Sequence, residues 1–298
     1  MTNLGDLEVF TRVVSTGSMS AAGRTLGFSP AVISKRIKRL EDRLGTRLFQ
    51  RTTRQISLTE AGQGFYDRVL GIMAGIEEAE AFASGRSGQP QGTLRITAPT
   101  SFGRMHVAPH LARFIEAHPD LIVNIVLSDE FTDIVAESFD LAIRIGELSD
   151  STLVARKLVP VRRILCASPA YIARYGTPET IDDLADHICL RQHNHDTWKL
   201  ESEAGSMSYK PQGRLITNSS EVVREAVLSG AGIALRSTWD VGSDLKSGKL
   251  MQVLPAWEGS RNLFVSALYP SRQFLPAKVR LFIDYLAGLY GPDPYWER

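Results

Sequence analysis

Residues 18–44, with the sequence SMSAAGRTLGFSPAVISKRIKRLEDRL, predict two short helices joined by a tight turn. Ser18 is a favourable N-cap for the first helix, and Gly27 can end that helix in a left-handed conformation. Ser29 and Pro30 then supply the N-cap and the first-turn proline of the second helix. A helix, a glycine turn and a second helix together form the helix-turn-helix pattern.

The second helix has two unlike faces. One face carries apolar residues at the 4-3-4 spacing of a buried stripe, namely Ile33, Ile37, Leu40 and Leu44. The other face is small, polar and basic, and its side chains can approach DNA closely and donate to bases and phosphates. The expected DNA-contacting residues of this helix are Ser29, Pro30, Ala31, Ser34, Lys35 and Lys38. The alternative is a solvated basic face on an ordinary helical hairpin.

Residues 48–59 predict a small β-hairpin, or wing, beside this helix. Ile56 and Leu58 alternate with polar residues, as in a half-buried strand. Arg51 and Arg54 bracket a polar turn, which places them for contact with phosphates or with the minor groove. We therefore expect both arginines to belong to the DNA-binding surface.

Charge is divided unevenly along the chain. Residues 1–60 contain ten Lys and Arg and five Asp and Glu, a net charge of +5. The other residues contain 24 Lys and Arg and 28 Asp and Glu, a net charge of −4, so the whole chain is near neutral at +1. This division fits an electrostatic footprint on DNA that is confined to the basic part. We expect residues 1–59 to form a winged helix-turn-helix domain, called the head below, that binds double-stranded DNA.

The bulk properties are those of a globular protein without export or membrane segments. The hydrophobic fraction is 43% and the charged fraction is 22%, both ordinary for such proteins. Cys166 and Cys189 are too few for a disulfide framework, which favours a reducing compartment. No basic-then-apolar signal segment opens the chain, and no apolar run approaches the roughly 20 residues that span a bilayer. We expect a cytoplasmic protein without a membrane partner.

Sequence signatures of catalysis and metal binding are weak. There is no Gly-x-x-x-x-Gly-Lys phosphate loop and no complete Gly-x-Gly-x-x-Gly fingerprint. His106 and His110, and likewise His193 and His195, are spaced for metal binding, but Pro109 disturbs the helix at the first pair. We expect solvated or packed histidines, and a protein that is no enzyme and uses no cofactor or metal.

Residues 60–84 predict a long helix that follows the head. Its apolar positions alternate by four and three residues, the pattern of a two-stranded helical seam, and include Phe65, Val69, Ile72 and Ile76. Because the pattern leaves no other part of the head for this stripe to pack on, we expect the helix to dimerise two chains. The alternative is that it packs across its own body. Residues 85–92 are rich in Gly, Ser, Pro and Gln and predict a hinge.

Residues 93–298, called the body below, alternate strands and helices. Nearly continuous apolar strands such as 121–127 are typical of buried parallel strands in an α/β fold. The pattern predicts two lobes with two crossings between them. Lobe I is expected at about 93–158 and 266–298, and lobe II at about 159–265. The two lobes are expected to enclose a cleft.

The whole chain resembles the LysR-type transcriptional regulators. In the head the resemblance rests on LEVF at 7–10, GSMSAA at 17–22, SKRIKRLE at 34–41, LGTRLFQR at 44–51 and LTEAG at 58–62. In the body it rests on GTLRI at 92–96, DLAIR at 140–144, LVARKL at 153–158, CASP at 166–169 and AVLSGAGIA at 226–234. The resemblance implies a winged-helix head, a linker-helix homodimer that can pair into a dimer of dimers, and a two-lobed, periplasmic-binding-protein-like effector domain.

Two helix starts in the body offer places for an anionic ligand. Residues 99–101 join the first strand of the body to its first helix, and residues 218–220 repeat this arrangement in lobe II. Hydroxyls and free helix N–H groups at such turns attract anions. By the resemblance, these turns and the strand end at 144–146 face the cleft. The expected effector-binding residues are Pro99, Thr100, Ser101, Phe102, Ser128, Arg144, Gly146, Asn218 and Ser219. The alternative is that Ser and Thr only cap helices.

These features together predict a DNA-binding transcriptional regulator controlled by a small, anionic metabolite bound between two α/β lobes. Two heads in a homodimer would contact the halves of a near-palindromic operator. Ligand binding would shift lobe closure and reposition the heads. Two alternatives remain: a catalytic or transport-type binding protein that kept only the two-lobed body, and a structural DNA-binding protein without an effector. The basic head argues against the first, and ligand-induced stabilisation of the body would exclude the second.

Overall fold

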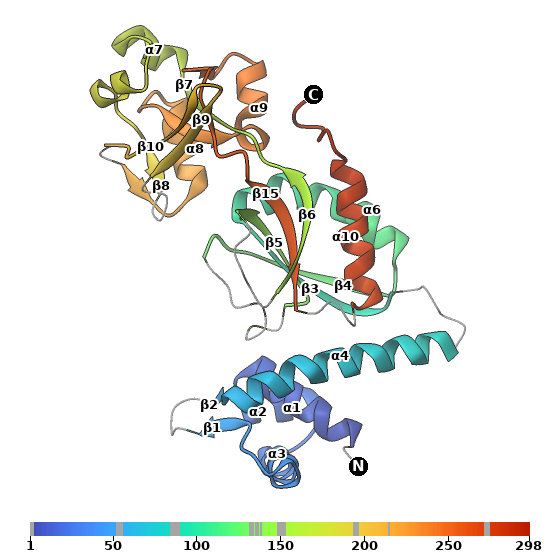
Figure 1. Ribbon diagram of the computed structural model, residues 1–298. Helices are drawn as coiled ribbons and strands as arrows, with labels where there is room; N and C mark the ends of the chain where they lie inside the picture. Colours follow the sequence, from blue (N-terminus) through green and yellow to red (C-terminus); the bar gives the residue numbers. More distant parts are fainter. Residues whose placement is uncertain are drawn as a thin grey trace.

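The computed structural model describes residues 3–51, 56–83, 90–130, 134, 137, 139–147, 153–192, 197–213, 215–270 and 275–298. Within these residues the chain forms three successive parts: the head, the long helix α4 and the two-lobed body. In Figure 1 the head and α4 lie below the body, and lobe II lies above lobe I.

Three helices build the core of the head: α1 (Leu4–Thr16), α2 (Met19–Leu26) and α3 (Pro30–Leu44). Gly27 ends α2 at a φ of 71°, a left-handed conformation that glycine adopts without steric cost. The helices bury a common apolar core that includes Val9, Phe10, Val13, Ala22, Ile33, Ile37 and Leu40. The predicted helix-turn-helix and three positions of its buried stripe are therefore confirmed.

The C-terminal end of α3 differs from the prediction. Leu44, expected in the buried stripe, is 38% exposed, whereas Glu41 is buried. Oε1 of Glu41 accepts hydrogen bonds from the backbone N–H groups of Leu48 and Phe49, at 2.9 and 3.1 Å. The carboxylate lies inward because it satisfies two donors at the point where the chain leaves α3 for the wing.

The wing is a short antiparallel hairpin of β1 (Phe49–Arg51) and β2 (Ile56–Leu58). This pairing confirms the predicted hairpin. Arg51 ends β1 and its backbone pairs with that of Ile56. Residues 52–55, among them Arg54, lie outside the described residues.

Helix α4 (Glu60–Ala83) packs its first half on the head. Val69 is fully buried there, and Phe65 contacts the aromatic core of the head. The expectation that the head leaves nothing for this stripe to pack on is therefore wrong, because α4 supplies a fourth wall of the head's core. Ile72 is 48% exposed and Ile76 is half-buried. Of the four predicted seam residues, Phe65 and Val69 therefore pack on the head of their own chain, and a seam at Ile72 and Ile76 stays a prediction.

Lobe I is built on a five-stranded mixed sheet in the order β4-β3-β5-β15-β6. Its strands are β3 (Gly92–Ala98), β4 (Leu121–Leu127), β5 (Leu141–Gly146), β6 (Val154–Pro160) and β15 (Phe264–Tyr269). β3 is parallel to β4 and to β5, whereas β15 is antiparallel to β5 and to β6.

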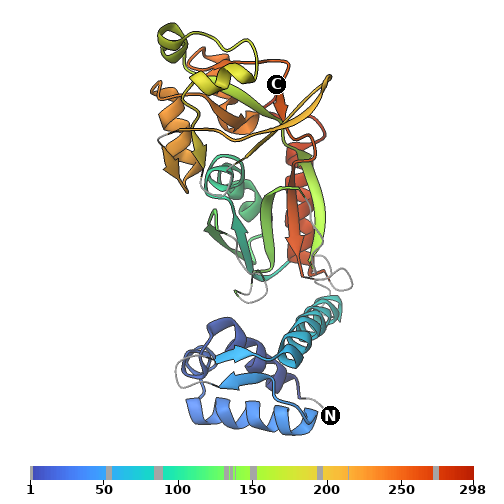
Figure 2. The same cartoon turned by 60° about the vertical axis from the view of Figure 1, so that its left-hand side comes forward.

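Helices follow β3 and close the body. Residues 100–117 wind continuously through α5 (Thr100–Phe102), a π-helical turn (Gly103–Val107), a 3-10 turn (Ala108–His110) and α6 (Leu111–Ala117). Helix α10 (Ala277–Tyr290) lies along the sheet of lobe I, as Figure 2 also shows. Phe114 of α6 contacts Phe282 of α10, with ring centroids 4.9 Å apart, within the core of this lobe.

Lobe II contains a second sheet in the order β10-β9-β14-β7-β12, with β13 also paired to β7. The strands of this sheet are β7 (Arg163–Ala167), β9 (Trp198–Ser202), β10 (Gly205–Tyr209), β12 (Ala234–Ser237), β13 (Met251–Gln252) and β14 (Glu258–Gly259). β8 (Arg191–Gln192) and β11 (Ile216–Thr217) form a separate parallel pair. The helices are α7 (Pro169–Tyr175), a 3-10 turn (Asp182–Asp186), α8 (Ser220–Leu228) and α9 (Thr238–Lys246).

The expected parallel arrangement is confirmed for β3, β4 and β5, whereas the main sheet of lobe II is antiparallel. β9 and β10 pair from Ser202 and Gly205, and a connection this short can join only antiparallel strands. β6 leads out of lobe I and β15 leads back into it, so these neighbours run in opposite directions. The sheet of lobe I extends to Pro160 and resumes at Phe264, two residues beyond each expected limit.

The two predicted crossings between the lobes lie side by side. The N–H group of Val161 in the first crossing donates to the carbonyl oxygen of Leu263 in the second, at 2.9 Å. The lobes are thus connected by a paired double strand of chain, the geometry expected for a hinge between two rigid units.

Candidate functional site

The candidate DNA-contacting residues of α3 lie at its start and on its outer side. Oγ of Ser29 accepts a hydrogen bond from the backbone N–H of Val32 at 3.4 Å and so caps the helix. Ser34 is half-buried, and the exposed candidates are Ser29, Pro30, Ala31, Lys35 and Lys38. The predicted basic face is therefore one continuous surface of α3.

The arginines of α3 are held by the head, whereas its lysines are not. Arg36 donates to a backbone oxygen of α1, and Nη2 of Arg39 lies 2.8 Å from both carboxylate oxygens of Asp6. Among the described residues, none forms a hydrogen bond or an ion pair with the side chain of Lys35 or Lys38. The ammonium groups of these lysines are therefore left for an external anion such as a phosphate.

Two buried carboxylates, which the sequence reasoning missed, position this surface. Asp6 joins α1 to α3 through Arg39, and Arg43 approaches the same carboxylate at 3.9 Å. Glu41 joins α3 to the wing through the backbone of β1. The signal in the sequence was the presence of acidic residues in a strongly basic segment, because an acid in such a segment needs a structural partner.

In lobe I, the predicted turn at residues 99–102 follows β3 and begins α5. Ser101 is 2% exposed, and no described residue forms a hydrogen bond with its Oγ. It makes no capping hydrogen bond, so the capping alternative does not account for this hydroxyl. A buried hydroxyl without a partner is costly unless water or a ligand satisfies it. Phe102 is fully buried against Trp239 of lobe II, so it supports the turn from inside.

Thr100 and Ser128 form hydrogen bonds with neighbouring groups of the protein. The backbone N–H of Thr100 donates to Oδ1 of Asp129 at 2.8 Å. Oγ of Ser128 accepts a hydrogen bond from the backbone N–H of Glu130 at 3.2 Å. A carboxylate of the protein therefore occupies a helix start that the sequence predicted for an external anion.

Arg144, near the end of β5, is half-buried at the same edge of the sheet. Its Nη1 donates to the carbonyl of Ile143 at 3.0 Å and its Nη2 to Oγ1 of Thr97 at 3.3 Å. Burial lowers the pKa of Arg144, while the charges of Asp129 and Glu137 act to raise that pKa. Arginine nevertheless remains charged in proteins, so this strand end keeps one cation.

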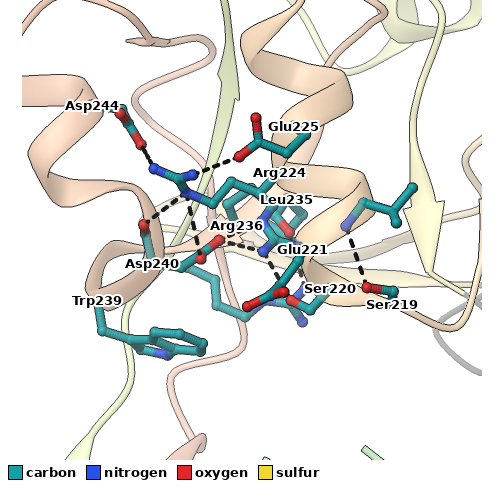
Figure 3. Close-up of polar contacts among 12 residues, drawn as sticks. Ser219, Ser220, Glu221, Arg224, Glu225, Leu235, Arg236, Trp239, Asp240 and Asp244 are labelled. Carbon is teal, nitrogen blue, oxygen red and sulfur yellow. Dashed lines mark hydrogen bonds and ion pairs between the residues drawn. The ribbon is translucent and has the colours of Figure 1, made fainter. Parts of the chain in front are cut away.

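In lobe II, a buried ion-pair network fixes the start of α8, as Figure 3 shows. Oγ of Ser219 caps the helix by accepting a backbone hydrogen bond at 3.4 Å. Nη2 of Arg236 donates to Oγ of Ser220 at 2.9 Å, and Nε of Arg236 donates to Asp240 at 2.9 Å. Asn218 is exposed just before this start. The capping alternative therefore describes Ser219 but not Ser101.

Side-chain contacts join both predicted turns of lobe I to lobe II. Nε of Arg104 lies 2.8 Å from Oε1 of Glu221. Arg104 stands three residues after Ser101, and Glu221 directly follows Ser220, so this ion pair joins the turn of lobe I to the turn of lobe II. Glu147, directly after Gly146 and β5, accepts two hydrogen bonds from side chains of lobe II. Gly146 itself has open space where a Cβ atom would stand.

His106 and His110 of lobe I belong to an aromatic cluster at the lobe junction. The hydroxyl of Tyr295 lies 2.7 Å from Nδ1 of His106 and 3.2 Å from Nε2 of His110. Nε2 of His106 lies 3.0 Å from the backbone oxygen of Trp239 in lobe II. Burial lowers the pKa of both histidines. Residues 193–196 lie outside the described residues, and within the described ones no three His, Cys, Asp or Glu side chains are grouped to hold a metal.

Both cysteines are buried free thiols. Burial raises the pKa of Cys166 to about 12 and the pKa of Cys189 to about 11. Because the thiolate is the reactive form, these side chains are packing elements of lobe II rather than nucleophiles.

A helix-turn-helix head followed by a two-lobed body defines a regulator with separate nucleic-acid and ligand modules, and comparison with known proteins identifies its family. Residues 4–63 match the family described as bacterial regulatory helix-turn-helix protein, lysR family. Residues 87–290 match the LysR substrate binding domain. The chain therefore belongs to the LysR family of bacterial regulatory proteins.

Similar proteins include regulators of known name. The transcriptional regulator DmlR of Escherichia coli K12 is 40% identical over 287 residues, which cover 95% of this chain and 93% of that protein. The transcriptional activator TtdR of the same strain is 38% identical over 95% of this chain and 92% of its own. The full-length structure of the Vibrio cholerae virulence activator AphB is 31% identical, covers 96% of this chain and 99% of its own, and has a TM-score of 0.61.

Membership of the family settles the general function. The protein is a DNA-binding transcriptional regulator of the LysR type with an effector-binding domain, and it is not an enzyme. The winged helix-turn-helix head and the two α/β lobes are the fold that the sequence predicted. Among the helices within the described ranges, none combines the length and apolar character needed to cross a membrane.

Proposed function

We propose that the body binds a small anionic metabolite where the turns at 99–102, 144–147 and 218–221 meet. The observation that carries this proposal is Ser101, whose buried hydroxyl finds no partner among the described residues. Two cations lie nearby. Arg104 belongs to the same helical winding as Ser101, and Arg144 lies at the edge of the sheet where that winding begins. A ligand that accepts a hydrogen bond and carries negative charge suits these groups better than a cation or a hydrocarbon.

The head is proposed to bind DNA with α3 in the major groove and the wing beside it. Lys35 and Lys38 would contact phosphates, and Ala31 and Ser34 would contact base edges. Ser29 and Pro30 would lie at the start of the helix against the DNA backbone, where free N–H groups bind phosphate. Arg51 and Arg54 of the wing would contact phosphate or the minor groove.

Two copies of the chain are proposed to act together on one operator. Ile72 and Ile76 of α4 would form the seam of a homodimer, and two dimers would pair into a tetramer. Two heads related by a two-fold axis fit a near-palindromic operator. The working units are residues 1–59 for DNA binding, 60–84 for dimerisation, 85–92 for the hinge and 93–298 for the effector, and the compartment is the cytoplasm.

Ligand binding would act by shifting the population of lobe arrangements. The lobes are linked by two adjacent crossings and by a few side-chain contacts, so a ligand held by both lobes favours one arrangement over the other. The heads of a dimer would then change their relative position through α4.

A thermal-shift screen of the full-length protein tests the effector proposal. The library would contain small organic acids, amino acids, aromatic compounds and organic cations at matched ionic strength. We expect stabilisation by at least one organic anion and a weaker response from Ser101→Ala. If the compound that binds is a cation, or if Ser101→Ala binds the anion with unchanged affinity, the proposal is wrong.

A further inference from the structure

Arg104 and Glu221 form the ion pair that joins the lobes at the proposed effector site. Nε of Arg104 lies 2.8 Å from Oε1 of Glu221, and the two side chains are 58% and 41% exposed. Because both groups remain open to water, their attraction is weak and the contact is easily exchanged. The carboxylate of a ligand has the same charge and shape as the Glu221 side chain, so it can bind Arg104 in its place.

The hydroxyl of Ser101 marks the same place independently. Ser101 lies in α5 and Arg104 in the π-helical turn that directly continues it, so the two residues are within one turn of each other along the same winding. Ser101 is 2% exposed, and Glu221 does not satisfy its Oγ. An anion held by Arg104 would therefore bind within one helical turn of a donor that the described part of the protein leaves unpaired.

The charges around the turns are already balanced by the protein. Glu221 pairs with Arg104, and the charges of Asp129 and Glu137 act on Arg144. A bound anion would therefore add an uncompensated negative charge near these carboxylates, and the repulsion between like charges costs free energy. Moving one carboxylate into water removes this cost, and Glu221 is the one held only by an exposed pair.

We propose that Glu221 is an internal competitor of the effector. In this exchange the anionic group of the effector binds Arg104, and Glu221 releases it and turns to solvent. The inference rests on the proposed function and deepens it in two ways. It makes Arg104 an effector-binding residue, and it makes Glu221 the residue that sets the concentration of anion needed to occupy the site. Because the pair also joins the lobes, each exchange removes one contact between α8 and lobe I.

The test compares three variants of the full-length protein by isothermal titration calorimetry. The variants are Glu221→Gln, Arg104→Gln and the control Glu225→Gln. Glu225 lies one turn further along α8, is 71% exposed, and pairs with Arg224 at 2.9 Å (Figure 3). The probes are acetate, succinate, citrate and inorganic phosphate at constant ionic strength, with sodium chloride as the reference.

The exchange predicts that substitutions of the two partners change the affinity for an anion in opposite directions. An anion that binds the wild type should bind Glu221→Gln about two- to sixfold more tightly, the range expected when an exposed ion pair no longer competes. It should bind Arg104→Gln several-fold more weakly, and the Glu225→Gln control should match the wild type. Binding by Glu221→Gln alone, with none by the wild type, would also support the exchange.

Other outcomes separate the two proposals. If Glu221→Gln and Arg104→Gln change the affinity in the same direction, the ion pair is only a structural contact between the lobes. The exchange is then rejected, and the proposal of an anionic effector is retained. If Glu225→Gln has the same effect as Glu221→Gln, the change is a general charge effect and the exchange is again rejected. If no probe binds the wild type or Glu221→Gln, both the exchange and the anionic effector are rejected.

Discussion

Val69 and Ile72 stand one turn apart on α4, yet Val69 is fully buried in the head whereas Ile72 is 48% exposed. One apolar stripe therefore serves two environments. Its first half completes the core of the head, and beyond it the stripe continues with Ile72, which is exposed, and Ile76, which is half-buried. An exposed isoleucine on a long helix is a typical part of a helix–helix interface.

Substitutions at these two positions should separate folding from assembly. Ile72→Glu should leave the head folded but abolish the proposed dimer, because two carboxylates would face an apolar seam. Val69→Glu should instead unfold the head, since a buried unpaired carboxylate costs several kcal/mol. Circular dichroism and sedimentation velocity measure the two effects. A dimer of Ile72→Glu at micromolar concentration would rule out this part of α4 as the seam.

Lys35 should contribute to DNA affinity without contributing to sequence choice. If its free ammonium contacts a phosphate, Lys35→Ala should weaken binding to all sequences and lower the salt slope by about one unit. Ser34→Ala should change the preferred sequence instead. Fluorescence anisotropy at several salt concentrations measures the slope, and Lys246→Ala, an exposed lysine of lobe II, is the matched control. An unchanged slope for Lys35→Ala would contradict the assignment.

Ser101→Ala should affect stability and ligand binding in opposite directions. Removal of an unsatisfied buried hydroxyl should raise the free energy of unfolding without ligand by up to about 1 kcal/mol. The same change should weaken the binding of an anionic ligand by about 1–3 kcal/mol. Ser219→Ala is the contrasting control, because loss of its N-cap should lower stability by about 1 kcal/mol. Urea unfolding would measure the stability of both variants. A Ser101→Ala variant less stable than the wild type would show that the hydroxyl is satisfied internally.

The lobe junction should weaken in mild acid because of His106. Burial lowers the pKa of His106 below its ordinary value of 6.5, and His110, Asp240 and Tyr295 are the ionisable groups around it. As the pH falls below about 6.5, the unfolded chain takes up a proton that the folded state resists, so stability present above that pH is lost. The loss is at most about 1.4 kcal/mol per pH unit for this group. Urea unfolding at pH 7.5 and 5.5 should show a smaller difference for His106→Gln, and equal differences would disprove the role.

Local signals explain why the head could be predicted from its sequence. Caps and a glycine turn act within a few residues, so Ser18, Gly27 and Ser29 mark the helix ends whatever surrounds them. The inward position of Glu41 depends instead on backbone donors seven and eight residues away. No periodic pattern contains that information, and the apolar spacing therefore led to Leu44.

Buried charges explain what the sequence concealed in lobe II. Helix α9 was not predicted, because its buried residues mix Trp239 and Val241 of the apolar core with Asp240 and Asp244, which bind Arg236 and Arg224. A hydrophobic pattern does not detect a helix whose buried face is partly ionic. The candidate site shows the same limit. Ser101 and Ser219 look alike as residues at helix starts, and only their three-dimensional surroundings show that one hydroxyl caps a helix and the other lacks a partner.

The position of β15 between β5 and β6 constrains the order in which the protein can fold during synthesis. The ribosome delivers β5 and β6 more than a hundred residues before β15, so the sheet of lobe I must wait for the strand that joins β5 to β6. Lobe II, encoded in between, can fold first. Until β15 arrives, β5 and β6 present unpaired edges that can attract other chains. Nascent chains of this regulator should therefore be clients of chaperones at the stage when lobe II is complete and lobe I is still open.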